Sequence, residues 1–195
     1  MSNSCDALEK SRYLGVTGSG DTTGEELRIS ITTNENDNTI TIFDSGIGMT
    51  RDDMISNLGT IARSGSKNFL NEIGKSDSES RKTSESIIGQ FGVGFYSSFI
   101  VGKEVRVLSK TADCQEGHMW ISNGIGSFEI SDVDCDEFSR GTKVTVYLKE
   151  GSDQFSRAAD VTGIIKKYSN FLPFPITLNG TKINTLDAIW SQPKN

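Results

Sequence analysis

The feature that most constrains this chain is the stretch 39–50, Thr-Ile-Thr-Ile-Phe-Asp-Ser-Gly-Ile-Gly-Met-Thr, in which a strand runs directly into a turn with two glycines. Side chains alternate between the two faces of a strand, so Ile40, Ile42 and Asp44 share one face. A carboxylate therefore ends a row whose other members face the core. Two interpretations stay open: Asp44 caps the turn, or it lies in the floor of a ligand pocket.

A second glycine-rich stretch stands at 89–97, Gly-Gln-Phe-Gly-Val-Gly-Phe-Tyr-Ser, and leads into an apolar run of helical length at 95–101. Glycine loops that open a helix offer free backbone N–H groups to phosphate oxygens, and the helix dipole adds positive potential there. The pattern is neither a P-loop nor a dinucleotide-binding fingerprint. It predicts either a phosphate-binding loop or a tight strand-to-helix turn.

The first segment, residues 2–13, has helical periodicity, and it places Asn3, Asp6 and Lys10 on one face. Asn and Asp supply oxygen ligands of the kind that magnesium prefers, and Lys supplies positive charge. The row is consistent with a magnesium or phosphate site, and equally with a solvated helix surface.

Residues 59–88 lie between the two glycine-containing stretches and combine glycine hinges with a long polar run. The part from 74 to 86 is almost wholly polar, so it cannot bury itself. A mobile segment in this position predicts a lid over a bound ligand, or an ordinary flexible loop.

Strand-like runs account for much of the remaining chain. The segments 27–31 and 39–44 alternate around a turn at 34–38, which predicts an antiparallel hairpin with one buried face. Further runs follow at 104–109, 119–121, 127–130, 142–148 and 172–178, with an amphipathic helix at 155–168. Helices and strands segregate, so we expect an α+β fold: a two-layer sandwich with helices on one face of a mainly antiparallel sheet.

Two smaller features complete the local predictions. Pro173 and Pro175 predict that the strand at 172–178 lies at an edge of the sheet, and a second hairpin is expected at the Asn-Gly pair 179–180. Thr50 and Asp53 have the spacing of a capping box, which predicts a short helix beginning there. The single histidine, His118, is expected in a polar loop.

Composition narrows the function classes. The 195 residues suit one domain, and the net charge of −6 without any Lys or Arg run argues against a nucleic-acid surface. No apolar run approaches the roughly 18 residues that span a bilayer, so we expect no membrane span. The three cysteines are an odd number without a paired motif, which indicates neither a disulfide scaffold nor a zinc site.

Four motifs occur in a fixed order: Asp-Ser-Gly-Ile-Gly-Met at 44–49, Ser-Asn-Leu-Gly-Thr-Ile-Ala at 56–62, Ser-Gly-Ser-Lys at 64–67, and the glycine-rich stretch 89–97. Together they resemble the N-terminal ATP-binding domain of the Hsp90 chaperones, over nearly the whole chain. Gyrase, MutL and the histidine kinases of the same (GHKL) ATPase superfamily share the Asp-x-Gly-x-Gly element but not the second motif. The polar insertion before Ile87 and the C-terminal stretch 168–190 look most like the mitochondrial branch of the family, the tumour necrosis factor receptor-associated proteins.

The resemblance implies the Bergerat ATP-binding fold and a role for each matched position on the base side of the pocket. Asp44 would accept the adenine amino group, and Thr142 with ordered water would complete the base site. Met49 would pack on the ring, with Gly48 close by. Such a carboxylate is satisfied by a ligand donor rather than left unpaired.

The same resemblance implies the phosphate side. Asn3 would ligate Mg²⁺, and Asp6 and Lys10 would line the same helix face. Further positions matched to the nucleotide site are Asn57 and Leu58 after the first turn, Arg63, Ser64 and Gly65 in the lid, and Gly92, Val93, Gly94 and Phe95 around the phosphates.

The resemblance also implies what these 195 residues lack. In the family, a Glu four residues before the Asn orients and deprotonates the attacking water, but only Met1 and Ser2 precede Asn3. The first strand and helix of the family's domain, and the middle-domain Arg that reaches the γ-phosphate, are absent as well. We therefore expect a single nucleotide-binding domain, 1–195, that is N-terminally truncated and has its catalytic Glu outside the chain.

For the intact protein the resemblance implies an ATPase that binds ATP or ADP with Mg²⁺. Lid closure over 59–88 would drive the pairing of two protomers in a homodimer, and the clients would be unfolded or partly folded proteins. A mitochondrial matrix location follows from the branch, with the cytoplasm as the alternative.

Two other classes of function compete with this one. A phosphotransferase or signalling kinase would use the same pocket, but it needs a phospho-acceptor histidine domain, which the sequence lacks. A non-catalytic interaction fragment with a malformed pocket would bind no nucleotide and would associate through an exposed sheet edge.

The first testable prediction concerns turnover. The 195-residue chain is expected not to hydrolyse ATP at an appreciable rate, because the Glu that activates water is not among its residues. A phosphate-release assay on the chain and its Asp44→Asn variant checks this. Hydrolysis that disappears in the variant would show that the chain carries its own catalytic group.

Overall fold

The computed structural model describes residues 1–16, 26–59 and 94–184 of the chain. Its helices and strands are, in chain order, α1 Ser2–Val16, β1 Ile29–Asn34, β2 Thr39–Asp44, α2 Arg51–Leu58, the 3₁₀ turn η1 Phe95–Ser97, α5 Ser98–Val101, β3 Gly102–Lys110, β4 Glu116–Ser122, β5 Phe128–Asp134, β6 Gly141–Leu148, the 3₁₀ turn η2 Asp153–Ser156, α6 Ala158–Tyr168, β7 Ile176–Leu178 and β8 Thr181–Lys182.

The strands of the described ranges form one eight-stranded sheet in the order β5-β4-β3-β6-β2-β1-β7-β8. β1 and β7 run parallel, and every other neighbouring pair is antiparallel. The predicted hairpin of β1 and β2 is present, with Ile31 opposite Ile42. The hairpin of β7 and β8 is present too, and its turn residues Asn179 and Gly180 have φ of 48° and 81°, the left-handed conformation that Asn and Gly tolerate best. The mainly antiparallel sheet is confirmed.

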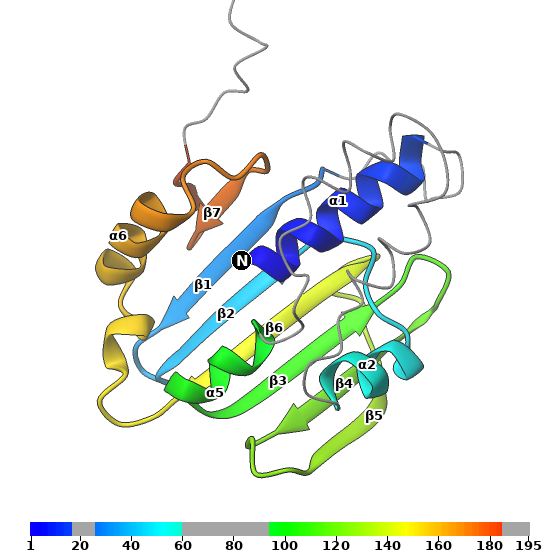
Figure 1. The fold of residues 1–195 in the computed structure, drawn as a ribbon, viewed down its shortest axis with the longest axis horizontal. Helices are drawn as coiled ribbons and strands as arrows, with labels where there is room; N and C mark the ends of the chain where they lie inside the picture. Colours follow the sequence, from blue (N-terminus) through cyan, green and yellow to red (C-terminus); the bar gives the residue numbers. More distant parts are fainter. Residues whose placement is uncertain (17–25, 60–93, 185–195) are drawn as a thin grey trace, which may run out of the picture.

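The helices cover one face of this sheet in two patches (Figure 1). α1 and α6 pack over β1 and β7, and their shared core includes Leu8, Ile29 and Ile165. α2 packs over β3 and β4, where Met54 and Trp120 are buried in a second core. The α+β two-layer sandwich expected from the sequence is confirmed. The part of the sheet between α1 and α2, called the strip below, includes Ile40, which packs against both cores.

α2 begins as its sequence predicts. The Thr50 hydroxyl accepts from the Asp53 N–H at 3.2 Å, and the Asp53 carboxylate accepts from the Thr50 N–H at 3.1 Å. This reciprocal capping box satisfies two of the N–H groups that a helix start leaves without partners. It fixes the helix so that Met54 and Leu58 face the second core.

The opposite face of the sheet carries polar pairs. Thr41 on β2 and Thr145 on β6 are direct partners, and their hydroxyl oxygens are 3.1 Å apart. Because side chains alternate along a strand, Thr145 points away from the helices while Thr142, three residues earlier, points toward them.

Two predictions are wrong. β7 is not an edge strand, because it pairs with β1 on one side and β8 on the other; Pro173 and Pro175 lie before it and cost the sheet no hydrogen bond. His118 is not in a loop but in β4, where it pairs with Ser109 of β3. The glycine at 117 and the charged residues around it hid this strand's first half from sequence patterns.

Cys5, Cys114 and Cys135 are all free cysteines in the structure. Over the described parts of the chain, the helices are too short or too polar to cross a bilayer.

Removing the cap of α2 tests this part of the fold. Thr50→Ala is expected to lower the free energy of unfolding by about 1 kcal/mol, because the Asp53 N–H loses its acceptor. Urea denaturation measures the change, and Thr50→Ser, which keeps the hydroxyl, is the matched control. Equal losses in both variants would mean that the methyl group of Thr50, not the cap, is what stabilises α2.

Candidate functional site

Three neighbouring strands end in polar residues at the same edge of the strip between α1 and α2. Asp44 of β2 lies directly opposite Thr142 of β6, and Thr142 lies directly opposite Ser109 of β3. All three are buried, and partners in register project to the same face of a sheet. The Ser109 and Thr142 hydroxyls are 2.8 Å apart, so a continuous polar row crosses the floor of this strip.

Asp44 is the charged member of the row, and it is 5% exposed. Burial raises the pKa of its carboxyl to about 7, against an ordinary value of 3.8, while hydrogen bonds from the Gly46 N–H and the Ser4 hydroxyl and the charge of the N-terminal amine act in the opposite direction. The Gly46 bond is 3.2 Å long. An acid this poorly compensated favours any ligand that brings a hydrogen-bond donor to it.

The glycine turn after β2 is seated directly on β3. A Cβ on Gly48, whose φ is +72°, would lie 2.0 Å from the Lys110 carbonyl oxygen, so only glycine fits there. The next residue, Met49, donates its N–H to the Ser109 Oγ at 2.9 Å. The turn predicted from two glycines is therefore fixed in position over the polar row, and the Met49 side chain packs partly buried against the second core.

α1 closes the other side of the strip. A Cβ on Gly46 would meet the Ala7 Cβ at 2.6 Å, which shows how closely the helix approaches the turn. Asn3, one helical turn earlier, is exposed, and its Oδ1 is 3.7 Å from the point where a Cβ of Gly94 would lie. Asn3 and Gly94, both predicted to contact phosphate or Mg²⁺, are therefore brought together although about 90 residues of chain separate them.

The other two residues of the predicted α1 row are not on a solvated surface. Asp6 is 1% exposed and Lys10 is 8% exposed. The solvated-surface interpretation of the row is therefore wrong for these two residues, and it remains open for Asn3 alone.

The remaining predicted residues of the described chain lie on α2 and η1. Leu58 is buried in the second core, and its carbonyl accepts from the Tyr96 hydroxyl at 2.8 Å. Phe95 meets Trp120 edge-on, with ring centroids 5.6 Å apart. Asn57 is half-buried on α2. Any role of Leu58 or Phe95 toward a ligand would use the backbone, since both side chains pack in the core.

Five predicted site residues lie outside the described residues: Arg63, Ser64, Gly65, Gly92 and Val93. The predicted lid, 59–88, lies there as well except for Gly59, which ends α2.

Two residues of the site were missed in the sequence. Ser4 was hidden in the polar part of α1. Ser109 ends the row Val105, Val107, Ser109, in which two buried valines are followed by a polar residue of the same parity. A polar residue at the end of an apolar strand row is the same pattern that pointed to Asp44.

Side-chain clusters that bind metal ions in proteins would be another kind of functional site. The described residues contain no group of three or more His, Cys, Asp and Glu side chains that could hold a metal ion. His118 Nδ1 lies 2.9 Å from the Asp132 carboxylate across β4 and β5, so its ring is already engaged. This placement gives no support to a histidine that accepts phosphate.

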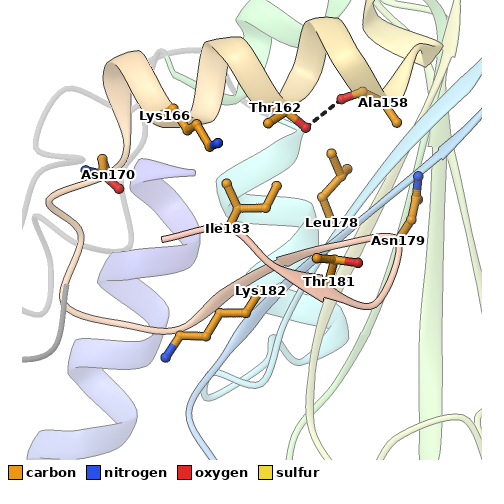
Figure 2. Close-up of a pocket in the computed structure, with 9 residues that line it drawn as sticks. All are labelled: Ala158, Thr162, Lys166, Asn170, Leu178, Asn179, Thr181, Lys182 and Ile183. Atoms are coloured by element: carbon orange, nitrogen blue, oxygen red, sulfur yellow. Dashed lines mark hydrogen bonds between the residues drawn. The ribbon is translucent and has the colours of Figure 1, made fainter. Parts of the chain in front are cut away.

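A separate groove of about 650 Å³ lies between α6 and the β7–β8 hairpin (Figure 2). Polar and apolar side chains of both elements line it, among them Lys166, Asn170 and Ile183. The described residues that line the groove include no carboxylate and none of the predicted site residues. We therefore place the candidate site in the strip with Asp44 and not in this groove.

Residues 1–147 match the protein family described as histidine kinase-, DNA gyrase B-, and HSP90-like ATPase. This range includes Asp44, Ser109 and Thr142 and both glycine-rich stretches of the sequence.

Individual relatives are similar over the whole chain. The TNF receptor-associated protein 1 homologue, mitochondrial, of Dictyostelium discoideum is 44% identical over 100% of this chain and 27% of its own length. The chaperone protein HtpG of Desulfitobacterium hafniense is 44% identical over 100% of this chain and 31% of its own. Heat shock protein 75 kDa, mitochondrial, of Rattus norvegicus is 46% identical over 97% of this chain and 26% of its own length. The resemblance found in the sequence is confirmed, and the chain spans about a quarter to a third of these relatives' length.

The raised pKa of Asp44 predicts how stability depends on pH. An acid whose pKa is higher in the folded chain contributes most stability below its unfolded pKa of 3.8, and this contribution is lost as pH rises through about 7. The wild-type chain is therefore expected to lose a few kcal/mol relative to Asp44→Asn between pH 4 and 8, at about 1.4 kcal/mol per pKa unit. Urea denaturation across this range measures the difference. Parallel curves for the two proteins would mean that Asp44 keeps an ordinary pKa.

Proposed function

This chain belongs to the family of histidine kinase-, DNA gyrase B-, and HSP90-like ATPases, and from that premise we propose that it is the nucleotide-binding domain of an Hsp90-type chaperone. ADP and ATP would bind in the strip between α1 and α2, with the adenine over the polar row. The intact protein would be an ATPase whose nucleotide binding and lid closure drive its conformational cycle.

The observation that carries this proposal is the state of Asp44. Its carboxyl is buried and has few donors, so its pKa is about 7 and a large part of the population is ionised near neutral pH. An exocyclic amine supplies the missing N–H, and a hydrogen bond to a charged group contributes about 1.5–3 kcal/mol. Thr142 stands beside Asp44 in register and supports recognition of the same edge of the base.

The phosphates would extend from the base toward α1 and Gly94. The Asn3 side chain is exposed there and its amide oxygen faces Gly94, which suits Mg²⁺, a cation that takes oxygen ligands and is held by few protein groups plus phosphates and water. Asn3 would be the protein ligand of the metal, and the metal would neutralise charge on the polyphosphate. Asp6 and Lys10 would support this face of α1 from within.

The wider role is carried over from the relatives. HtpG is named a chaperone, and the whole of this chain is similar to 31% of it. We infer that the intact protein acts on unfolded or partly folded client proteins and works as a homodimer. A mitochondrial location is supported by the mitochondrial relatives, while the bacterial ones leave a cytoplasmic location as the alternative.

Titration calorimetry with ADP and Mg²⁺ tests the base site. Asp44→Asn is expected to bind ADP about tenfold more weakly or worse, because the amide presents one acceptor where the carboxylate presents two and lacks its charge.

The matched control is Asp134→Asn, which makes the same chemical change at an exposed position of β5. It should bind as the wild type does. Equal ADP affinity in wild type and Asp44→Asn would remove Asp44 from the base site, and no ADP binding by the wild type would defeat the proposed function itself.

A further inference from the structure

Ser109 stands at the junction of the glycine turn and the polar row. It is 0% exposed, and its Oγ makes three contacts: the Met49 N–H at 2.9 Å, the Gly141 carbonyl oxygen at 3.0 Å and the Thr142 Oγ1 at 2.8 Å. Each contact belongs to a different part of the site. The turn, the start of β6 and the residue opposite Asp44 therefore all meet at one hydroxyl.

A serine hydroxyl has one proton to donate and two lone pairs that accept. The Met49 N–H must donate to it, and the Gly141 carbonyl can only accept from it. All three contacts are hydrogen bonds in a single arrangement: Ser109 donates to Gly141, and Thr142 donates to Ser109. In the other arrangement Ser109 donates to Thr142, and two oxygen lone pairs face each other across 3.0 Å, which is unfavourable in a site with no exposed surface.

We propose that Ser109 is a positioning residue that sets which bases the site accepts, because it accepts the hydrogen bond that the Thr142 hydroxyl donates. Thr142 then presents only lone pairs to the strip, as the ionised Asp44 beside it does. Where these acceptors face the 6-position of the base, they favour a 6-amino purine, whose two N–H groups can donate to Asp44 and Thr142, over a 6-oxo purine, whose oxygen lone pairs would face theirs. This inference rests on the proposed function, because it assumes that the base lies over Asp44.

The same hydroxyl also holds the turn that covers the row. The turn touches β3 at two adjacent points, Gly48 against the Lys110 carbonyl and the Met49 N–H on Ser109. The first contact is steric and the second is the hydrogen bond. Ser109→Ala removes the hydrogen bond but not the close approach of Gly48 to Lys110. The variant therefore affects both the turn and the direction of the Thr142 hydroxyl, and the two effects are separated by comparing ligands.

The test compares ADP with inosine diphosphate, whose base carries a 6-oxo group, by titration calorimetry. Wild type is expected to prefer ADP, and in Ser109→Ala this preference should shrink by about fivefold or more, the value of one net hydrogen bond. A purely structural role of Ser109 would weaken both ligands in parallel. An unchanged ADP-to-IDP ratio in a variant that still binds ADP would therefore overturn the inference.

Three further variants keep the test decisive. Ser109→Thr restores the hydroxyl and should restore the ratio. Thr145→Val removes a hydroxyl from the opposite face of β6 and should bind both ligands as the wild type does. Thr142→Val, which leaves Ser109 in place, should reduce the ADP-to-IDP ratio because it removes the acceptor that Ser109 is proposed to orient. An unchanged ratio in this variant would contradict the mechanism even if Ser109→Ala does not fold.

These outcomes separate the two claims. If the wild type binds neither diphosphate, the proposed function fails and the base preference has no site to act in. If the wild type binds ADP and Asp44→Asn weakens this binding, but Ser109→Ala leaves the ADP-to-IDP ratio unchanged, the proposed function stands and only the role of Ser109 is lost.

Discussion

The candidate site depends on one energetically unfavourable feature: a carboxyl group is buried at the end of a row of apolar side chains on a strand. Ile40 and Ile42 face the core, and Asp44 continues their row into the strip between the two cores. Hydrogen bonds from the Gly46 N–H and the Ser4 hydroxyl offset only part of the desolvation, so the pKa rises to about 7. The features around it, the close approach of α1, the glycine turn on β3 and the buried Thr142 and Ser109, shape a site that a hydrogen-bond donor can complete.

Much of this architecture could be predicted from the sequence because strand periodicity is local. The parity of Ile40, Ile42 and Asp44 was enough to place the carboxyl on the core face, and the spacing of Thr50 and Asp53 was enough to begin α2. The predictions failed where a local signal depends on distant partners. Prolines before β7 cannot reveal that β1 and β8 pair with it on both sides, and the weakly patterned start of β4 becomes a strand only because β3 and β5 flank it.

Candidate site residues could be named from the sequence, but their arrangement could not. Asn3 and Gly94 are far apart in the chain and meet in the structure, as the phosphate prediction requires. Burial of Asp6 and Lys10 could not be derived from one helix, since it depends on what packs over that face. The contribution of Ser109 needed three distances, because the direction of a hydroxyl proton follows from all of its partners together.

The most direct test is to follow the side-chain carboxyl carbon of Asp44 by NMR through a pH titration, with and without saturating ADP. The account predicts a midpoint near pH 7 in the free chain, because the group is buried with too few donors. With ADP bound, the midpoint should fall well below that, because the purine amine stabilises the ionised form. A midpoint near the ordinary value of 3.8 in the free chain, or one that ADP leaves unchanged, would contradict it.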